Sequence, residues 1–520
     1  MGGFGISTVP QMKRFIAHLL CLPVVVLSAD WPQGAGGGDF RSEDNAPINW
    51  SVALEENITW KITLPETGQS TPVIAKGKVF FSTLKPVEAD STLGKDIIAW
   101  CCDAGSGKVL WKREIVGKHP LRLSGCFSDS SAPPAVVADN RVIFLNASGR
   151  ITCFDLKGKS LWSKPLLSVG RTLPFLHGNR YVFTRQIYPP EPNGVFPHKY
   201  ADSPKEMWTQ LQALDIKSGK IIWTSECGVN MGMATMPQTR ADGRPVAVVG
   251  RGGGHGPPEK PFGISMIDLR NGKTLWTLPL EGFMATMSYR LHKGAVHVFH
   301  RGEHLSVNAV TGKIDRRVPF VTDVPVRTLR DQVAMRTETL KQGKAKRLIT
   351  QNSNLLVGKY HYFRSYVRPW LGRVNVETGK VEYLELPLQL ARVPEQKDAY
   401  VWYAAPAAKG DPQLKNQAIV ASDLKNSRGF KVVGDKRSHG NGWGHIASPT
   451  PTVAGDHLYV PVMNGTVYII KWNAANLDAS AVMAINDLGV AGKSWTRASV
   501  SFAGGRAFAH TIRELICIGK

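Results

Sequence analysis

Residues 215–223 read DIKSGKIIW, and close copies of this stretch recur along the 520-residue chain. The copies that end in Trp are 103–111 (DAGSGKVLW), 155–162 (DLKGKSLW, one residue shorter) and 268–276 (DLRNGKTLW). Two further copies keep the Asn and the Gly-Lys pair but lack the Trp: 308–313 and 375–380. The chain is therefore built from repeats.

Each copy predicts a hairpin turn. The Asp or Asn side chain can accept hydrogen bonds from backbone amides two residues on, and the Gly allows the positive φ of a tight reversal. The flanking residues should then form paired antiparallel strands, and a Trp on the outgoing strand presents a large flat ring with one polar N–H. We predict that these Trp residues are structural and dock against the neighbouring repeat: Trp60, Trp111, Trp162, Trp223 and Trp276.

The spacing of the repeats predicts a β-propeller. The turn residues recur at intervals of 40 to 67 residues, which fits four-stranded blades of roughly 40 to 50 residues each. In these motifs the sequence resembles the bacterial quinoprotein-like (pyrroloquinoline quinone repeat) β-propellers of the secreted type. The resemblance implies a fold shared with the envelope assembly propeller lipoprotein and the quinoprotein alcohol dehydrogenases.

The predicted fold class is all-β, a single propeller of eight four-stranded blades with tryptophan-docking motifs. Residues 58–64 look like an outgoing strand without its hairpin, and residues 497–520 supply three strands without an outgoing one. Joining the two ends in one blade would remove both exposed edges. The long stretch 388–447 could hide or lack a blade, so seven and nine blades remain open.

The N-terminus has the composition of a secretory signal. Lys13 and Arg14 precede an apolar run at 15–27, which is too short to span a bilayer comfortably. We therefore expect an exported protein, periplasmic or extracellular, that is monomeric and has no membrane-spanning segment. The expected parts are a signal peptide at 1–29, an N-terminal arm at 30–54 and a propeller at 55–520, with insertions near 317–350 and 388–447.

The chain is strongly basic, with 64 Lys and Arg against 41 Asp and Glu and a formal net charge of +23. Such a charge favours an acidic partner, although general solubility would also account for it. Two insertions are notably basic, 327–347 and 425–437. They lack the interleaved aromatic residues that stack on bases, which disfavours nucleic acid. An unknown protein or an acidic polysaccharide remains, with these expected polyanion contacts: Lys341, Lys344, Lys346 and Arg347.

Two Gly- and His-rich segments, 251–256 and 439–445, are the predicted ligand-binding loops. Glycine lets a backbone approach a ligand, and imidazoles beside an indole could bind a metal ion or stack on a sugar. No third ligand follows at metal-site spacing, so no metal is predicted. The candidate residues are Arg251, His255, His439, Trp443 and His445. A second group, His297, His300 and His304, is not predicted to form a joint site, because strand alternation sends His297 and His300 to opposite faces.

The resemblance also implies an enzymatic alternative. The related dehydrogenases hold pyrroloquinoline quinone and calcium in the central channel, with two adjacent cysteines against the quinone. Cys101 and Cys102 are adjacent, but they align with ordinary strand positions directly before the turn Asp, so buried thiols are expected. The sequence proposes no catalytic residue and no cofactor. We expect a non-enzymatic binding scaffold, with a quinone-dependent alcohol or sugar dehydrogenase as the alternative.

Overall fold

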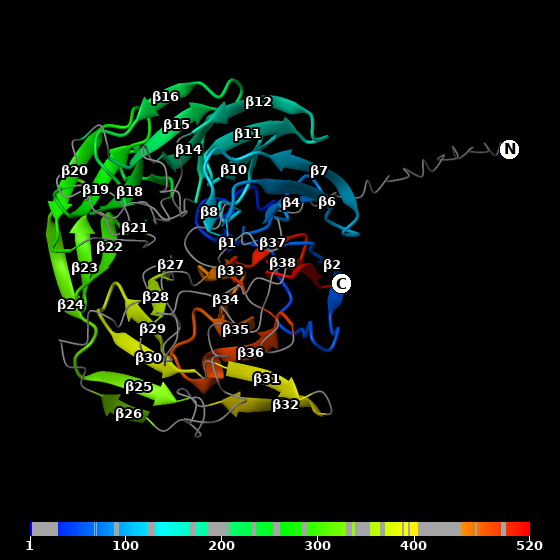
Figure 1. Cartoon of the computed structure of the whole chain (residues 1–520). Helices are drawn as coiled ribbons and strands as arrows, with labels where there is room; N and C mark the ends of the chain where they lie inside the picture. The colour runs from blue at the N-terminus through cyan, green and yellow to red at the C-terminus, as the bar shows by residue number, and fades with distance from the viewer. Residues whose placement is uncertain are drawn as a thin grey trace.

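The computed structural model is an all-β ring of small sheets around a central axis (Figure 1). Within the part of the chain described, the one helical element is the short 3-10 turn η3 (Ala479–Ala481), and no helix is long and apolar enough to cross a bilayer. The structure describes residues 1–2, 30–66, 68, 70–87, 93–122, 131–166, 173–185, 205, 208–230, 236–252, 260–282, 289–328, 335–338, 354–364, 370–386, 389–393, 396–403, 449–462, 465–489, 494 and 496–519.

Eight sheets form the ring, and each runs from an inner strand beside the axis to an outer strand at the rim (Figure 1). Blades 1 to 4 are β3 (Val73–Ala75), β4 (Lys78–Leu84), β6 (Ile97–Asp103), β7 (Val109–Ile115); β9 (Val136–Ala138), β10 (Arg141–Asn146), β11 (Arg150–Asp155), β12 (Ser160–Pro165); β13 (Phe175–His177), β14 (Arg180–Arg185), β15 (Gln210–Asp215), β16 (Ile221–Thr224); and β17 (Gln238–Thr239), β18 (Pro245–Arg251), β19 (Gly263–Asp268), β20 (Thr274–Pro279). Blades 5 to 8 are β21 (Arg290–His292), β22 (Ala295–His300), β23 (Glu303–Asn308), β24 (Ile314–Pro319); β27 (Leu355–Val357), β28 (Tyr360–Arg364), β29 (Trp370–Asn375), β30 (Val381–Glu385); β33 (Thr452–Ala454), β34 (His457–Pro461), β35 (Thr466–Lys471), β36 (Val482–Asp487); and β37 (Ser501–Ala503), β38 (Arg506–His510), β39 (Glu514–Ile518), β2 (Ile58–Thr63).

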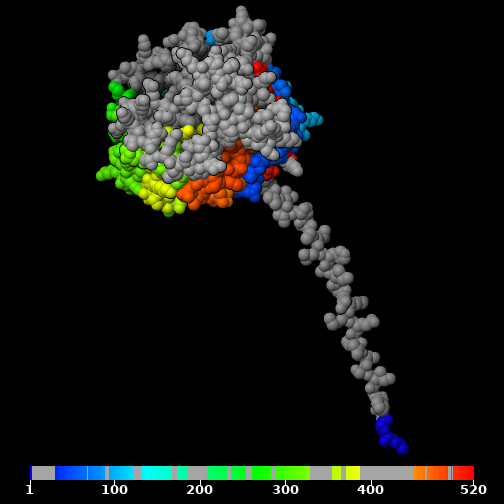
Figure 2. Space-filling model, turned by 90° about the horizontal axis from the view of Figure 1, so that it is seen from below, coloured from blue at the N-terminus to red at the C-terminus, as the bar shows by residue number. Residues whose placement is uncertain are grey.

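The two ends of the chain close the ring in blade 8. β2 pairs antiparallel with β39, so that Lys61 lies opposite Ile516 and Ile62 opposite Leu515. The prediction of eight blades closed by both termini is therefore confirmed, and seven and nine blades are excluded. Figure 2 shows blades 5, 6 and 7 in order along one side of the ring, in green, yellow and orange, followed by the blue N-terminal strands.

The predicted tryptophan docking is confirmed. Each Trp of the outer strands donates its Nε1–H to the carbonyl that follows the turn Asp or Asn of the next blade, at 2.9 to 3.2 Å. The Gly of that turn has positive φ and lies flat against the indole: a Cβ on Gly107 would meet Trp60 ring atoms at 2.7 Å. Glycine is thus required both for the turn and for the contact between blades.

Blades 5, 6 and 7 lack this Trp on the outer strand, and blades 5 and 6 are joined to the next blade by other side chains. Arg316 stands at the Trp position of β24 and donates to the carbonyls of Glu377 and Thr378, at 2.8 and 2.6 Å. Tyr383 is buried and donates to the Phe320 carbonyl, and the outer edge of blade 6 carries two added strands: β25 (Val324–Thr328), parallel to β30, and β26 (Met335–Glu338). The sequence predicted an insertion near 317–350 but not that part of it extends a blade. Two additional pairs complete the strands: β5 (Leu93–Gly94) with β8 (Leu121–Arg122), and β31 (Gln389–Val393) with β32 (Gln396–Tyr403).

Antiparallel order gives the ring two distinct faces. The docking turns, and the short turns between first and second strands, lie at one end of the blades, which we call the turn face. The connections between second and third strands, and those between blades, lie at the other end, which we call the loop face. Long connections are therefore gathered on the loop face, where binding residues of such scaffolds usually sit.

The N-terminal arm crosses the central channel near the turn face. Trp31 pairs with Ile74 of blade 1, the Pro32 carbonyl accepts from Val137 of blade 2, and the Gln33 side chain accepts from Leu176 of blade 3. On the far side, the Gly38 carbonyl accepts from Arg290 of blade 5, and β1 (Arg41–Ser42) pairs parallel with β33 of blade 7. The arm is thus hydrogen-bonded to the inner strands of five blades, and Trp31 and Phe40 are buried.

The rest of the arm passes between blades 7 and 8. Trp50 donates its Nε1–H to the Asp487 carbonyl at 2.9 Å and stacks on Tyr459. The Asp487 carboxylate accepts from the Ser51 hydroxyl and from the Ala53 amide. These contacts lead the chain from the channel to the rim, where β2 begins.

Candidate functional site

Most of the predicted site residues lie outside the described residues. These are His255, His439, Trp443 and His445 of the ligand-binding loops and the expected polyanion contacts Lys341, Lys344, Lys346 and Arg347. Their roles stay predictions. Arg251 is described: it is the last residue of β18, at the loop face of blade 4.

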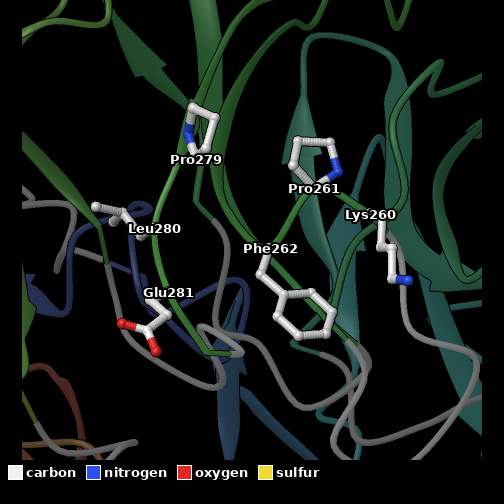
Figure 3. A pocket seen from close by; sticks show the side chains of 6 residues that line it. All are labelled: Lys260, Pro261, Phe262, Pro279, Leu280 and Glu281. Atoms are coloured by element: carbon white, nitrogen blue, oxygen red, sulfur yellow. The ribbon is translucent and has the colours of Figure 1, made fainter.

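A pocket of about 650 Å³ opens beside Arg251, on the loop face of the same blade. One wall is the segment that leads into β19, and the other is the end of β20 with the residues after it. Figure 3 shows the Phe262 ring between the Lys260 and Glu281 side chains, with two prolines on the same walls. The lining residues are Lys260, Pro261, Phe262, Pro279, Leu280 and Glu281.

The two walls are held together by the blade. Gly263 pairs with Pro279, and the Leu280 amide donates to the Phe262 carbonyl at 3.0 Å. Gly263 has φ of 132°, and a Cβ there would lie 2.1 Å from the Leu278 carbonyl oxygen. A residue other than glycine would therefore push the walls apart.

Arg251 is a buried cation behind the Lys260 wall. Its side chain is 4% exposed, Nη2 donates to the Lys260 carbonyl at 2.7 Å, and Nη1 lies 3.4 Å from the Ser265 hydroxyl. The guanidinium also lies 5.6 Å from the centre of the Trp208 ring. No carboxylate of the described residues lies within ion-pair distance of it, and its Nε–H is buried without a partner.

Charged side chains of both signs border the pocket. Arg251, Lys260 and Arg301 bring three cations, whereas Glu281 brings one carboxylate, which Arg301 already engages. The imidazole of His300 hydrogen-bonds the Glu281 main-chain carbonyl at 3.0 Å.

Three buried histidines form a second polar cluster, between blades 5 and 6. The His304 Nε2 lies 3.0 Å from His361 Nδ1, and the Asn354 amide donates to His361 Nε2 at 2.9 Å. His361 must then donate from Nδ1 to His304, and His297 stacks on His304. His300 lies outside this cluster, as strand alternation predicted. The sequence did not show that His304 contacts His297 across the hairpin and His361 across the two blades. Among the described residues no group of three His, Cys, Asp or Glu could hold a metal ion.

These histidines should make the fold sensitive to acid. Burial lowers the pKa of His297 to about 4 and of His304 to about 3, and it holds that of His361 well below 6.5. Below pH 6.5 the unfolded chain binds protons that the folded chain does not. Stability is then complete above pH 6.5 and falls by up to about 1.4 kcal/mol per pH unit for each histidine as the pH drops toward 4.

Denaturant midpoints measured at pH 7, 6 and 5 test this expectation in a window where most carboxylates stay ionised. His304→Gln should flatten the profile, since one acid-sensitive group is removed. Val310→Ala, an exposed change without a titratable group on the docking turn of the same blade, is the control and should leave the slope unchanged. A midpoint that is constant from pH 7 to 5 would contradict the expectation.

The adjacent cysteines are separate buried thiols. Cys101 and Cys102 occupy consecutive positions of β6 and pack in different cores, one toward blade 2 and one toward blade 8. Both are free, and burial raises the pKa of each thiol to about 12. The β-bulge between them recurs between Cys153 and Phe154 of blade 2, which supports the alignment of the repeats.

Fold and motifs together define a quinoprotein-like β-propeller. A family model described as Outer membrane protein assembly factor BamB matches residues 52–168 and 94–315, overlapping segments that together span just over half of the chain. The chain belongs to this family. No curated protein sequence matches it.

Solved structures with the same fold have little sequence in common with this chain. The quinohemoprotein alcohol dehydrogenase of Comamonas testosteroni is 11% identical and that of Pseudomonas putida 10%; each match covers 94% of this chain and 80% of the other, with a TM-score of 0.50. BamB from Moraxella catarrhalis is 10% identical over 88% of this chain and 96% of its own, with a TM-score of 0.44. At these identities the dehydrogenase matches establish the shared fold alone.

Proposed function

We propose that this protein is an exported, non-enzymatic propeller scaffold that binds an acidic partner on its loop face. The observation that carries the proposal is the N-terminal arm, which crosses the channel near the turn face and hydrogen-bonds the inner strands of five blades. The loop face carries the long connections, where binding residues of such scaffolds usually sit. The matching family is described as an assembly factor, which is a binding role, and the charge of +23 favours negatively charged groups.

The alternative is a quinone-dependent dehydrogenase, and the described residues do not fit its cofactor. Cys101 and Cys102 pack on opposite faces of a strand, so they cannot form a ring against a quinone without breaking blade 1. Within the described part, no cluster of carboxylates and imidazoles offers a cation site.

The proposal predicts salt-sensitive binding to an acidic polysaccharide. The protein should be retained on an immobilised polygalacturonate column at low salt and released steeply as salt rises, because exposed charges are screened over about 8 Å at physiological ionic strength. The variant with Lys341, Lys344, Lys346 and Arg347 all changed to Gln should elute much earlier.

The matched control removes the same charge from exposed turn-face lysines, by changing Lys108, Lys159, Lys220 and Lys313 to Gln. An equal shift from both sets would mean that net charge alone causes retention, and the insertion would lose its role. Failure of the parent protein to bind any acidic polymer would contradict the proposed function. Dye-linked alcohol oxidation after addition of pyrroloquinoline quinone and calcium would favour the dehydrogenase instead.

A further inference from the structure

The outer strands of blades 1, 2 and 3 carry exposed aliphatic side chains where they leave the docking turns. These strands, β7, β12 and β16, follow one another along the rim of the ring (Figure 1). The residue directly before the docking Trp is 41 to 43% exposed in all three strands, and Ile221 of β16 is 51% exposed. Single exposed aliphatic residues are normal, but these recur at the same place in neighbouring repeats. The set is Val109, Leu110, Leu161, Ile221 and Ile222.

The exposed apolar side chains are concentrated at one end of the blades. Apart from Met1, the described part of the chain exposes eight large apolar side chains. All of them except Val116 lie at the turn end of an outer strand or in a docking turn, and the two outside blades 1 to 3 are Val310 and Met483. The turn face therefore has an apolar rim, which burial in the ring does not explain.

The turns of blades 1 to 3 on this face are basic, and the structure describes all of them. They contain nine Lys and Arg against four Asp. Three of the Asp begin docking turns, and their carboxylates accept hydrogen bonds from amides of the turn itself at 2.8 to 2.9 Å. The six turns are 76–78, 103–109, 139–141, 155–160, 178–180 and 215–221.

Five lysines of the docking turns are exposed beside the aliphatic side chains. Lys108 directly precedes Val109, and Lys220 directly precedes Ile221. Among the described residues, no carboxylate lies within ion-pair distance of any of the five. The rim therefore presents positive charge and apolar surface side by side. The lysines are Lys108, Lys157, Lys159, Lys217 and Lys220.

This combination fits the surface of a bilayer that contains anionic lipids. The ammonium groups are attracted to the headgroup phosphates, and the aliphatic side chains can enter the boundary between headgroups and acyl chains. A soluble polyanion would engage the lysines but would leave the aliphatic side chains in water. A flat partner can also contact several blades at once, because the ring holds them in fixed positions.

We propose that the rim of blades 1 to 3 at the turn face rests on an anionic phospholipid membrane. The inference goes beyond the proposed function and does not depend on it, because the turn face and the loop face lie at opposite ends of the blades. In this orientation the loop face points away from the lipid, where it can meet its acidic partner.

The test is sedimentation with vesicles made of equal parts phosphatidylcholine and phosphatidylglycerol. The protein is used from residue 30, so that the apolar run at 15–27 cannot insert into the lipid; the described contacts of the ring lie within 30–519. We expect binding that weakens as salt rises, and no binding to vesicles of phosphatidylcholine alone.

The first variant changes Lys108, Lys159, Lys217 and Lys220 to Gln. It should bind the mixed vesicles at least about a hundredfold more weakly, since each basic residue near an anionic surface contributes about a fivefold gain. The charge-matched control changes Lys341, Lys344, Lys346 and Arg347 to Gln and should bind the vesicles almost as the parent does. Near-ultraviolet circular dichroism checks that each variant keeps the folded ring.

The second variant changes Leu110, Leu161 and Ile222 to Thr, which keeps the charge and suits a strand. It should bind at least about tenfold more weakly with an unchanged salt dependence, because the apolar contact with the lipid is lost. Val116→Thr is the control, since Val116 is 45% exposed but follows the loop end of β7.

Three results would overturn the inference. One is that the parent protein does not bind the mixed vesicles. Another is that both sets of four Gln substitutions weaken binding equally, which would mean that only net charge matters. The third is that the Thr variant binds as the parent does, which would indicate a polyanion as the partner of this rim. Retention on the polygalacturonate column decides the loop-face function separately, so the two proposals can fail independently.

Discussion

A chain that begins at residue 66 should lose the cooperative folding of the whole ring, although it lacks no complete blade. It lacks β2, the outer strand of blade 8, and with it the ladder to β39 and the docking of Trp60 on the Ala104 carbonyl. Blades 8 and 1 would then have no indole contact, and β39 would present a free edge that promotes aggregation. Removal of β2 should abolish most of the free energy of unfolding, which is roughly 5 to 15 kcal/mol for an ordinary protein.

A chain that begins at residue 55 is the matched comparison, because it lacks the arm but keeps β2. It should be less stable than the parent but still unfold in one transition. Near-ultraviolet circular dichroism during heating, together with size-exclusion chromatography, distinguishes the two outcomes. If the chain from residue 66 melts within a few degrees of the parent, closure through β2 does not hold the ring together.

Trp223→Ala should cost about 3 to 5 kcal/mol of unfolding free energy, the usual range for truncating a buried aromatic side chain. Trp223 is 7% exposed, donates to the Leu269 carbonyl at 3.2 Å and lies against Gly272 of the next turn. Trp276 is only half-buried, so the same change there should cost less.

Ile222→Ala is the control in the same strand, since Ile222 is 41% exposed and should change stability by no more than about 0.5 kcal/mol. Urea unfolding followed by circular dichroism gives the three free energies. A cost below 1 kcal/mol for Trp223→Ala would mean that the docking motif marks the blades without stabilising them.

The repeated turns made the fold predictable from the sequence. A turn with Asp, Gly and a following Trp imposes its own geometry. The number of blades could therefore be predicted despite the uncertain stretch 388–447. Contacts that depend on the assembled ring could not be predicted. The arm residues around Trp31 show no strand alternation, and their partners lie on five blades. The parallel pairing of β25 with β30 likewise has no local signal.

The candidate site was predicted in part. The glycine-rich loop singled out Arg251, but Phe262 and Glu281 were missed because they come from two walls that meet only when β19 pairs with β20. A usable signal was present: both segments place Pro and a large apolar residue just where a strand begins or ends, outside the alternation of the buried strand. The histidine cluster could not be predicted, because it forms only where two neighbouring blades pack together.

The arm in the channel has a consequence for the order in which the molecule forms. Residues 31–42 are made before every blade that they contact, yet their partners include Val453 of blade 7, which is made several hundred residues later. The arm therefore cannot take its final position until the last blades have been synthesised. Such long sequence separations are typical of slow folding. During that interval the chain exposes Trp31 and Phe40, and a cell that produces this protein must keep it soluble until the ring is complete.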